Sequence, residues 1–131
     1  MAIQQFTQSL DVRFLDMNAG NHLSNHTAIG YITDFVSEFL IKNGHSLTDV
    51  HGHSVLFTKI NAQFLKEVVY PANLTISVES AAVKSRKLLI NFVGTVNDKA
   101  HIKCEHEICF LKGGKVIKIG EDIATLFGCE V

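Results

Sequence analysis

Apolar residues are most concentrated between positions 29 and 41, in a stretch that predicts one long helix. Ser24 or Asn25 can cap its start, because a side-chain oxygen there can accept from the first free amides. We expect it to end near Asn43-Gly44, since glycine readily adopts the left-handed conformation at a helix end. Apolar positions occur on nearly all sides of this helix: Ile29, Tyr31, Ile32, Phe35, Val36, Phe39, Leu40 and Ile41. A helix of this kind must be surrounded by other structure.

Alternating apolar and polar positions predict strands before and after the helix. The first strand runs from about Phe6 to Leu15, and a second from His53 to about Leu65. In the second, four apolar residues share one parity, and Thr58 is the polar exception on that face. These four are Leu56, Ile60, Ala62 and Phe64.

The second half of the chain repeats this alternation between short polar turns. Breaks are expected at Pro71-Ala72-Asn73, at Lys84 to Lys87, at Asn97-Asp98-Lys99 and at Gly113-Gly114. The segments between them predict three strands. A short strand from Val116 to Ile119 and a helical turn within Glu121 to Phe127 complete the chain.

The element order predicts an α+β fold formed by a single domain of residues 1–131. An antiparallel sheet of five or six strands should wrap around the one long central helix. A sheet of this kind leaves an exposed edge, which favours self-association.

Composition limits the classes of partner and compartment. Twelve basic and thirteen acidic residues leave the 131-residue chain nearly neutral, so there is no overall basic field to attract nucleic acid. No apolar run approaches the length of a membrane span, and the N-terminus does not resemble a signal peptide. Cys104, Cys109 and Cys129 show no metal-binding spacing and are expected to be free thiols. These features favour a cytoplasmic protein with no metal and no cofactor.

A polar loop immediately before the helix carries most of the candidate chemistry. The pattern Asp16-x-Asn18 … His22-Leu23-x-Asn25 … Glu38-Phe39-Leu40 resembles the opening of hotdog-fold thioesterases of the 4-hydroxybenzoyl-CoA and acyl-CoA type. The similarity continues through Ala62-Gln63-Phe64 and the turn at Lys84 to Lys87. This resemblance implies a hotdog fold, a homodimer or dimer-of-dimers, and hydrolysis of acyl thioesters of coenzyme A or acyl carrier protein.

The loop departs from the family pattern at the residue expected to do the chemistry. The second acid of the family's D-x-D pair commonly serves as nucleophile or general base, and Asn18 occupies that position here. Asn21 replaces a glycine. In the first half of the helix, Ala28 and Thr33 replace a tyrosine and a glutamate.

Thioester hydrolysis needs a group that activates water and donors that hold the oxyanion. Free amides around Ser24 to Ala28 are candidate donors, because they lie at the positive end of the helix dipole. With asparagine at position 18, His22 is the best remaining acid/base. Asn18 could orient water or the thioester carbonyl, or simply shape the turn. Asp16 could fix the tautomer of His22, or act only in the structure of the loop.

Further residues have both a functional and a plain structural interpretation. Asp34 or Glu38 could supply the missing carboxylate from the helix if its face lines a cleft shared with a partner subunit. Asn25 could contact substrate, although a helix cap is the simpler role. The cluster Lys84, Arg86 and Lys87 could hold coenzyme A phosphates, or be an ordinary exposed turn. His51 and His53 share one face of a strand, as metal ligands can, but lack a third ligand.

Two alternatives to a hydrolase remain open. A non-catalytic acyl-CoA binding module would explain the missing carboxylate. A hotdog enoyl-CoA hydratase has a D-x-N-P-x-H loop, which Asp16-Met17-Asn18-Ala19 … His22 matches only loosely.

Overall fold

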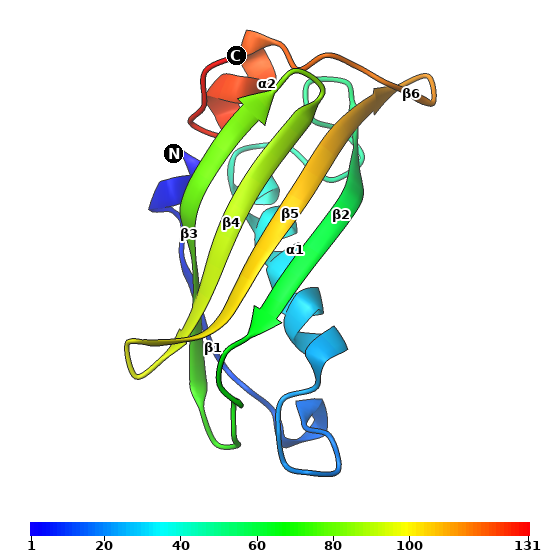
Figure 1. The fold of residues 1–131 in the computed structure, drawn as a ribbon. Coiled ribbons are helices and arrows are strands. Elements are labelled where there is room, and N and C mark those ends of the chain that lie inside the picture. The colour runs from blue at the N-terminus through cyan, green and yellow to red at the C-terminus, as the bar shows by residue number, and fades with distance from the viewer.

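A computed structural model describes residues 1–131 and shows a curled antiparallel sheet with one long helix packed against one face (Figure 1). The sheet order is β1-β3-β4-β5-β2, and β6 pairs with β5. The strands are β1 (Gln8–Asp11), β2 (Ser54–Phe64), β3 (Asn73–Lys84), β4 (Lys87–Val96), β5 (Lys99–Lys112) and β6 (Lys115–Val116). The helices are η1 (Ile3–Gln5), η2 (Phe14–Asp16), α1 (Asn25–Lys42) and α2 (Glu121–Leu126). The predicted α+β architecture is confirmed.

The long helix α1 has the predicted limits, and the sheet buries one stripe of its apolar residues. Ser24 is its N-cap, and Gly44, with φ of +81°, follows its C-cap at Asn43. One continuous stripe is buried: Ala28, Ile32, Phe35, Val36, Phe39 and Leu40. Ile41 is 55% exposed, so the apolar residues of α1 are not buried on every side within one chain. The sheet covers one broad side of α1, as expected for an amphipathic helix.

None of the helices is both long and apolar enough to cross a membrane.

The core lies between α1 and the concave face of the sheet. It forms one cluster of 26 buried residues. Within this cluster, aromatic rings from different elements pack against one another. Phe35 of α1 packs against Phe92 of β4, with ring centroids 5.5 Å apart. Phe127, just after α2, packs against Phe39 of α1 at 5.5 Å and closes one end of the core. The helical turn expected in the tail is therefore present and contributes apolar surface to the core.

A β-bulge in β2 changes which of its side chains face α1. The pairing with β5 shifts register between Phe57 and Lys59. Before the bulge, Val55 and Phe57 pack against the core, whereas Leu56 does not. A single parity from Leu56 to Phe64 was therefore wrong, because the extra residue at Thr58 moves later side chains to the opposite face.

The connection between β2 and β3 crosses the end of the sheet. β2 lies at one edge beside β5, and β4 and β5 separate it from β3. Residues 65–72 therefore run across the end of the sheet, beside the N-terminal end of α1 (Figure 1). On the way they bond to the loop before α1, where the amide of Leu23 donates to the carbonyl of Val68 at 2.8 Å. This crossing brings Lys66 and Glu67 to the polar loop before α1, which is distant from them in sequence.

Both terminal strands are shorter than predicted. The first ends at Asp11, and the segment Phe14–Asp16 forms the 3-10 helix η2 with Phe14 and Leu15 exposed. The Asp16 carboxylate accepts from the backbone amide and guanidinium of Arg13, which closes this turn. The last strand, expected to reach Ile119, ends at Val116.

Candidate active site

The Asn18 side chain shapes the polar loop. Its Oδ1 accepts hydrogen bonds from the amides of Gly20 (2.9 Å) and His22 (3.3 Å). Asn21 has φ of +61°, a conformation that asparagine tolerates better than most residues. The replacement of the family glycine at this position is therefore compatible with the same turn. The side-chain Oδ1 of Asn18 is therefore used to hold the loop in shape, whereas its Nδ2 makes no hydrogen bond within the chain.

Asp16 is a buried anchor and does not contact His22. Only 5% of its surface is exposed, and it accepts hydrogen bonds from Arg13 and from the Tyr31 hydroxyl on α1. The Arg13 guanidinium, together with the hydroxyl of Tyr31, lowers the pKa of Asp16 to about 2 despite burial, which opposes the shift. The suggestion that Asp16 fixes the tautomer of His22 is not supported, because the carboxylate faces Arg13 and Tyr31 instead.

The partner of the His22 ring is Glu67. His22 Nε2 lies 2.9 Å from Glu67 Oε2, and their side chains are 36% and 67% exposed. Glu67 lies in the segment that crosses from β2 to β3. The β-bridge between His22 and Val69 holds this segment against the loop. Sequence reasoning missed Glu67, because it assumed short turns between consecutive strands.

The N-terminus of α1 presents free amides. The first helical hydrogen bond runs from the amide of Ala28 to the carbonyl of Ser24 at 3.0 Å, and the Ser24 side chain makes no capping bond. The amides of Asn25, His26 and Thr27 precede this bond and remain available. The predicted group of oxyanion donors, around Ser24 to Ala28, is thereby reduced to these three.

A pocket of about 260 Å³ joins these groups. Its apolar wall comes from the loop, α1, the crossing segment and the ends of β2 and β5: Leu23, Ala28, Phe64, Val68 and Ile102. Its polar lining consists of Asn18, His22, Asn25, Lys66 and Glu67. Apolar walls with a few converging polar groups are typical of small-molecule sites. Asn18, His22 and Asn25, predicted from sequence, share this pocket with Lys66 and Glu67, which were not.

The other predicted residues lie elsewhere. Lys84, Arg86 and Lys87 are at the β3–β4 turn, at the opposite end of the sheet from the His22 loop (Figure 1). Along β5, Ile102 at the pocket and Ile108 beside Leu88 are roughly 20 Å apart, at about 3.3 Å per residue. Neither Asp34 nor Glu38 lines the pocket. Glu67, on the crossing segment, is the carboxylate that lines this pocket within one chain.

The histidines before β2 and the cysteines do not form a second candidate catalytic or metal site. His51 lies in a turn with φ of +51°, and its ring packs on His45 at 4.5 Å, so it does not share a strand face with His53. The three cysteines are free, and Cys104 and Cys109 are buried. No group of three or more His, Cys, Asp or Glu side chains is arranged to hold a metal ion.

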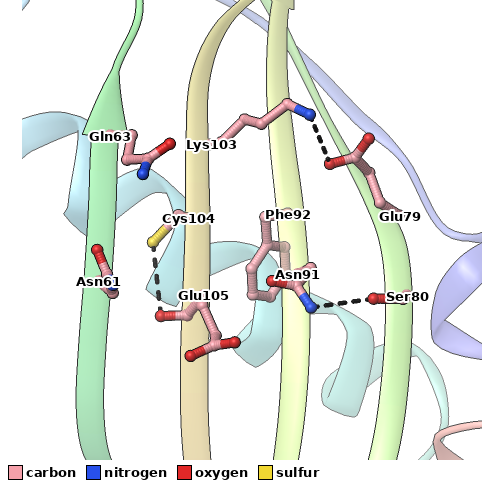
Figure 2. Close-up of a pocket in the computed structure, with 9 residues that line it drawn as sticks. All are labelled: Asn61, Gln63, Glu79, Ser80, Asn91, Phe92, Lys103, Cys104 and Glu105. Atoms are coloured by element: carbon pink, nitrogen blue, oxygen red, sulfur yellow. Dashed lines mark hydrogen bonds and ion pairs between the residues drawn. The ribbon is translucent and has the colours of Figure 1, made fainter.

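A second hollow lies on the opposite, outer face of the sheet (Figure 2). It crosses four strands and has mainly polar side chains, including Asn61, Asn91 and Glu105. An ion pair of 3.6 Å between Lys103 and Glu79 spans it. None of the residues predicted for the site lies here.

Solved structures with the same fold include several thioesterases. A hypothetical protein from Aquifex aeolicus superposes with a TM-score of 0.82 at 18% identity, covering 93% of this chain and 98% of the other. A gentisyl-coenzyme A thioesterase gives 0.81 at 12% identity, with 94% and 100% covered. A thioesterase from Thermus thermophilus, solved with coenzyme A and zinc, gives 0.78 at 16% identity, with 93% and 96% covered. No family model and no curated protein matches the sequence.

These similarities extend over nearly the whole chain, although the sequences have diverged widely. The protein therefore has the hotdog fold that thioesterases of known structure adopt, as the resemblance in its sequence implied.

Proposed function

We propose that this protein is a hydrolase of acyl thioesters, with coenzyme A thioesters as its substrates. The observation that carries the proposal is the pocket at the N-terminus of α1, where free helix amides, His22 and an apolar wall come together. The hotdog fold supports this assignment, since thioesterases have it. The coenzyme A bound in the Thermus thermophilus structure supports the choice of carrier.

Each part of the pocket has a distinct role in this proposal. The apolar wall, including Phe64 and Ile102, binds the acyl group by removing it from water. The thioester carbonyl lies at the N-terminus of α1, where the free amides stabilise the negative charge that develops on its oxygen. His22 belongs to the acid/base machinery that delivers water to the carbonyl carbon.

Asn18 has a positioning role at this site. Its Oδ1 is committed to the loop amides, and its Nδ2 is free to donate to the thioester carbonyl or to the attacking water. An amide cannot accept a proton from water at neutral pH, so Asn18 cannot replace the usual catalytic acid. Asn25 lines the pocket at the first turn of α1 and contacts the substrate from there.

A second copy of the chain completes the environment of the pocket. β2 has a hydrogen-bonded neighbour on one side only, and Leu56, Ile60 and Phe64 are each 40% exposed. An open edge with apolar side chains is suited to pairing with the same strand of another copy. Contact between Lys84, Arg86 or Lys87 and coenzyme A phosphates would have to come from such a neighbouring chain, whereas Lys66 is the cation at the pocket of its own chain.

The dimer is tested with Ile60→Lys, which places a charge on the exposed edge of β2. Sedimentation should show a dimer or tetramer for the wild type and a shift toward monomer for the variant. Asp34→Lys, at an exposed position of α1 beside β1, which is the opposite edge of the sheet, is the control. A monomeric wild type would contradict the interface.

The activity is tested by incubating the purified protein with a panel of acyl-CoA thioesters and a reagent that detects free thiols. We expect thiol release well above the background for at least one acyl class. Tight binding without thiol release would favour a non-catalytic acyl-CoA binding module. Hydration of a 2-enoyl-CoA with the thioester intact would identify a hydratase instead.

A further inference from the structure

We propose that Glu67 supplies the carboxylate that position 18 lacks, and that it is the general base of the site. This assignment rests on the proposed hydrolase function and refines the role of His22. Glu67 lies on the crossing segment between β2 and β3, and not on the polar loop or on α1. His22 then holds and polarises the Glu67 carboxylate instead of accepting the proton itself.

The contact between the two side chains fixes the position of the proton on His22. An ionised carboxylate only accepts hydrogen bonds, so the 2.9 Å contact from Nε2 to Glu67 Oε2 requires a proton on Nε2. The remaining ring nitrogen of neutral His22 is Nδ1. It lies against Gly20, about 3.5 Å from where a Cβ on that residue would be. Gly20 is not part of the pocket lining, so the edge of the ring that carries Nδ1 lies next to the loop.

The Glu67 carboxylate is the base that remains open to the pocket. Oε2 is bonded to His22, whereas Oε1 makes no hydrogen bond or ion pair in the chain. With 67% of its side chain exposed, Glu67 can be reached by water, and it lines the same pocket as the first residue of α1. Asp16 cannot take this role, because its buried oxygens are occupied by Arg13 and Tyr31.

The reaction then balances without another reactant. Glu67 takes a proton from water while the water oxygen forms a bond to the thioester carbonyl carbon. The negative charge on the carbonyl oxygen is held by the amides of α1. When the carbon–sulfur bond breaks, the sulfur leaves with the electron pair and takes the proton back from Glu67. The products are a carboxylic acid, which ionises in solution, and free coenzyme A.

The test compares kcat and KM of wild type, Glu67→Gln, Glu67→Asp and the control Glu79→Gln over a range of pH. Glu79 is also an exposed glutamate in an ion pair, but on the outer face of the sheet (Figure 2). We expect Glu67→Gln to lower kcat by about 100-fold or more, with KM little changed. The acid limb of its pH profile should disappear. Glu67→Asp should recover part of the rate, and Glu79→Gln should match the wild type.

The outcomes separate this assignment from the proposed function. An active wild type whose rate and pH profile survive Glu67→Gln would overturn the role of Glu67 alone. A wild type without turnover on any thioester would overturn the hydrolase proposal and this role together. Thermal unfolding of each variant excludes misfolding as the cause of a lost rate.

Discussion

Asp16 and Glu67 are two carboxylates in contact with the same stretch of chain, the polar loop and the start of α1. Asp16 is buried, and Arg13 and Tyr31 together provide several donors to it. Glu67 is mostly exposed, has one partner in His22, and keeps one oxygen free. A buried carboxylate with all its oxygens occupied stabilises structure, whereas an exposed one with a free oxygen at a pocket is available for chemistry. Position in the fold therefore distinguishes these two carboxylates more reliably than resemblance to a motif.

The largest expected contrast between them is in stability. Asp16→Ala leaves the Tyr31 hydroxyl and the Arg13 amide without their acceptor, and should lower the free energy of unfolding by about 2–3 kcal/mol. Glu67→Ala removes only an exposed ion pair and should change it by less than about 0.5 kcal/mol. Urea denaturation measures both. Equal losses would remove the distinction between the two roles.

A smaller contrast concerns acid pH. The pKa of Asp16 is lowered to about 2 from its ordinary value of 3.8 by Arg13, so its ionised form stabilises the folded chain. This stabilisation is complete above the ordinary pKa and is lost as pH falls through the lowered one. Between about pH 4 and about pH 2, the wild type should therefore lose more stability than Asp16→Asn. The urea concentration at the midpoint of unfolding measures this loss. If it falls equally in both proteins over that pH range, the pairing of Asp16 with Arg13 does not stabilise the fold.

Much of the fold could be predicted because it follows from local patterns. The end of α1 at Asn43-Gly44 and the turns between the later strands depend on residues close in sequence. The alternation in β4 and β5 predicted their buried faces for the same reason. The bulge at Thr58 was missed, since alternation alone cannot distinguish an extra residue from a polar exception.

The site was only partly predictable because it depends on contacts between distant segments. Asn18, His22 and Asn25 share the pocket as expected, and they come from one continuous stretch. Glu67 is brought to His22 only because residues 65–72 cross the end of the sheet, which no local pattern encodes. The position of Lys84 to Lys87 at the far end of the sheet likewise depends on strand order rather than on composition.

The most direct test of the whole account is the rate of thiol release from an acyl-CoA by wild type and by His22→Ala. We expect turnover by the wild type and a loss of about 100-fold or more in kcat for the folded variant. That loss would show that the chemistry occurs beside the N-terminus of α1. Equal rates for the two proteins would contradict the account, because the reaction would then not depend on the His22 site.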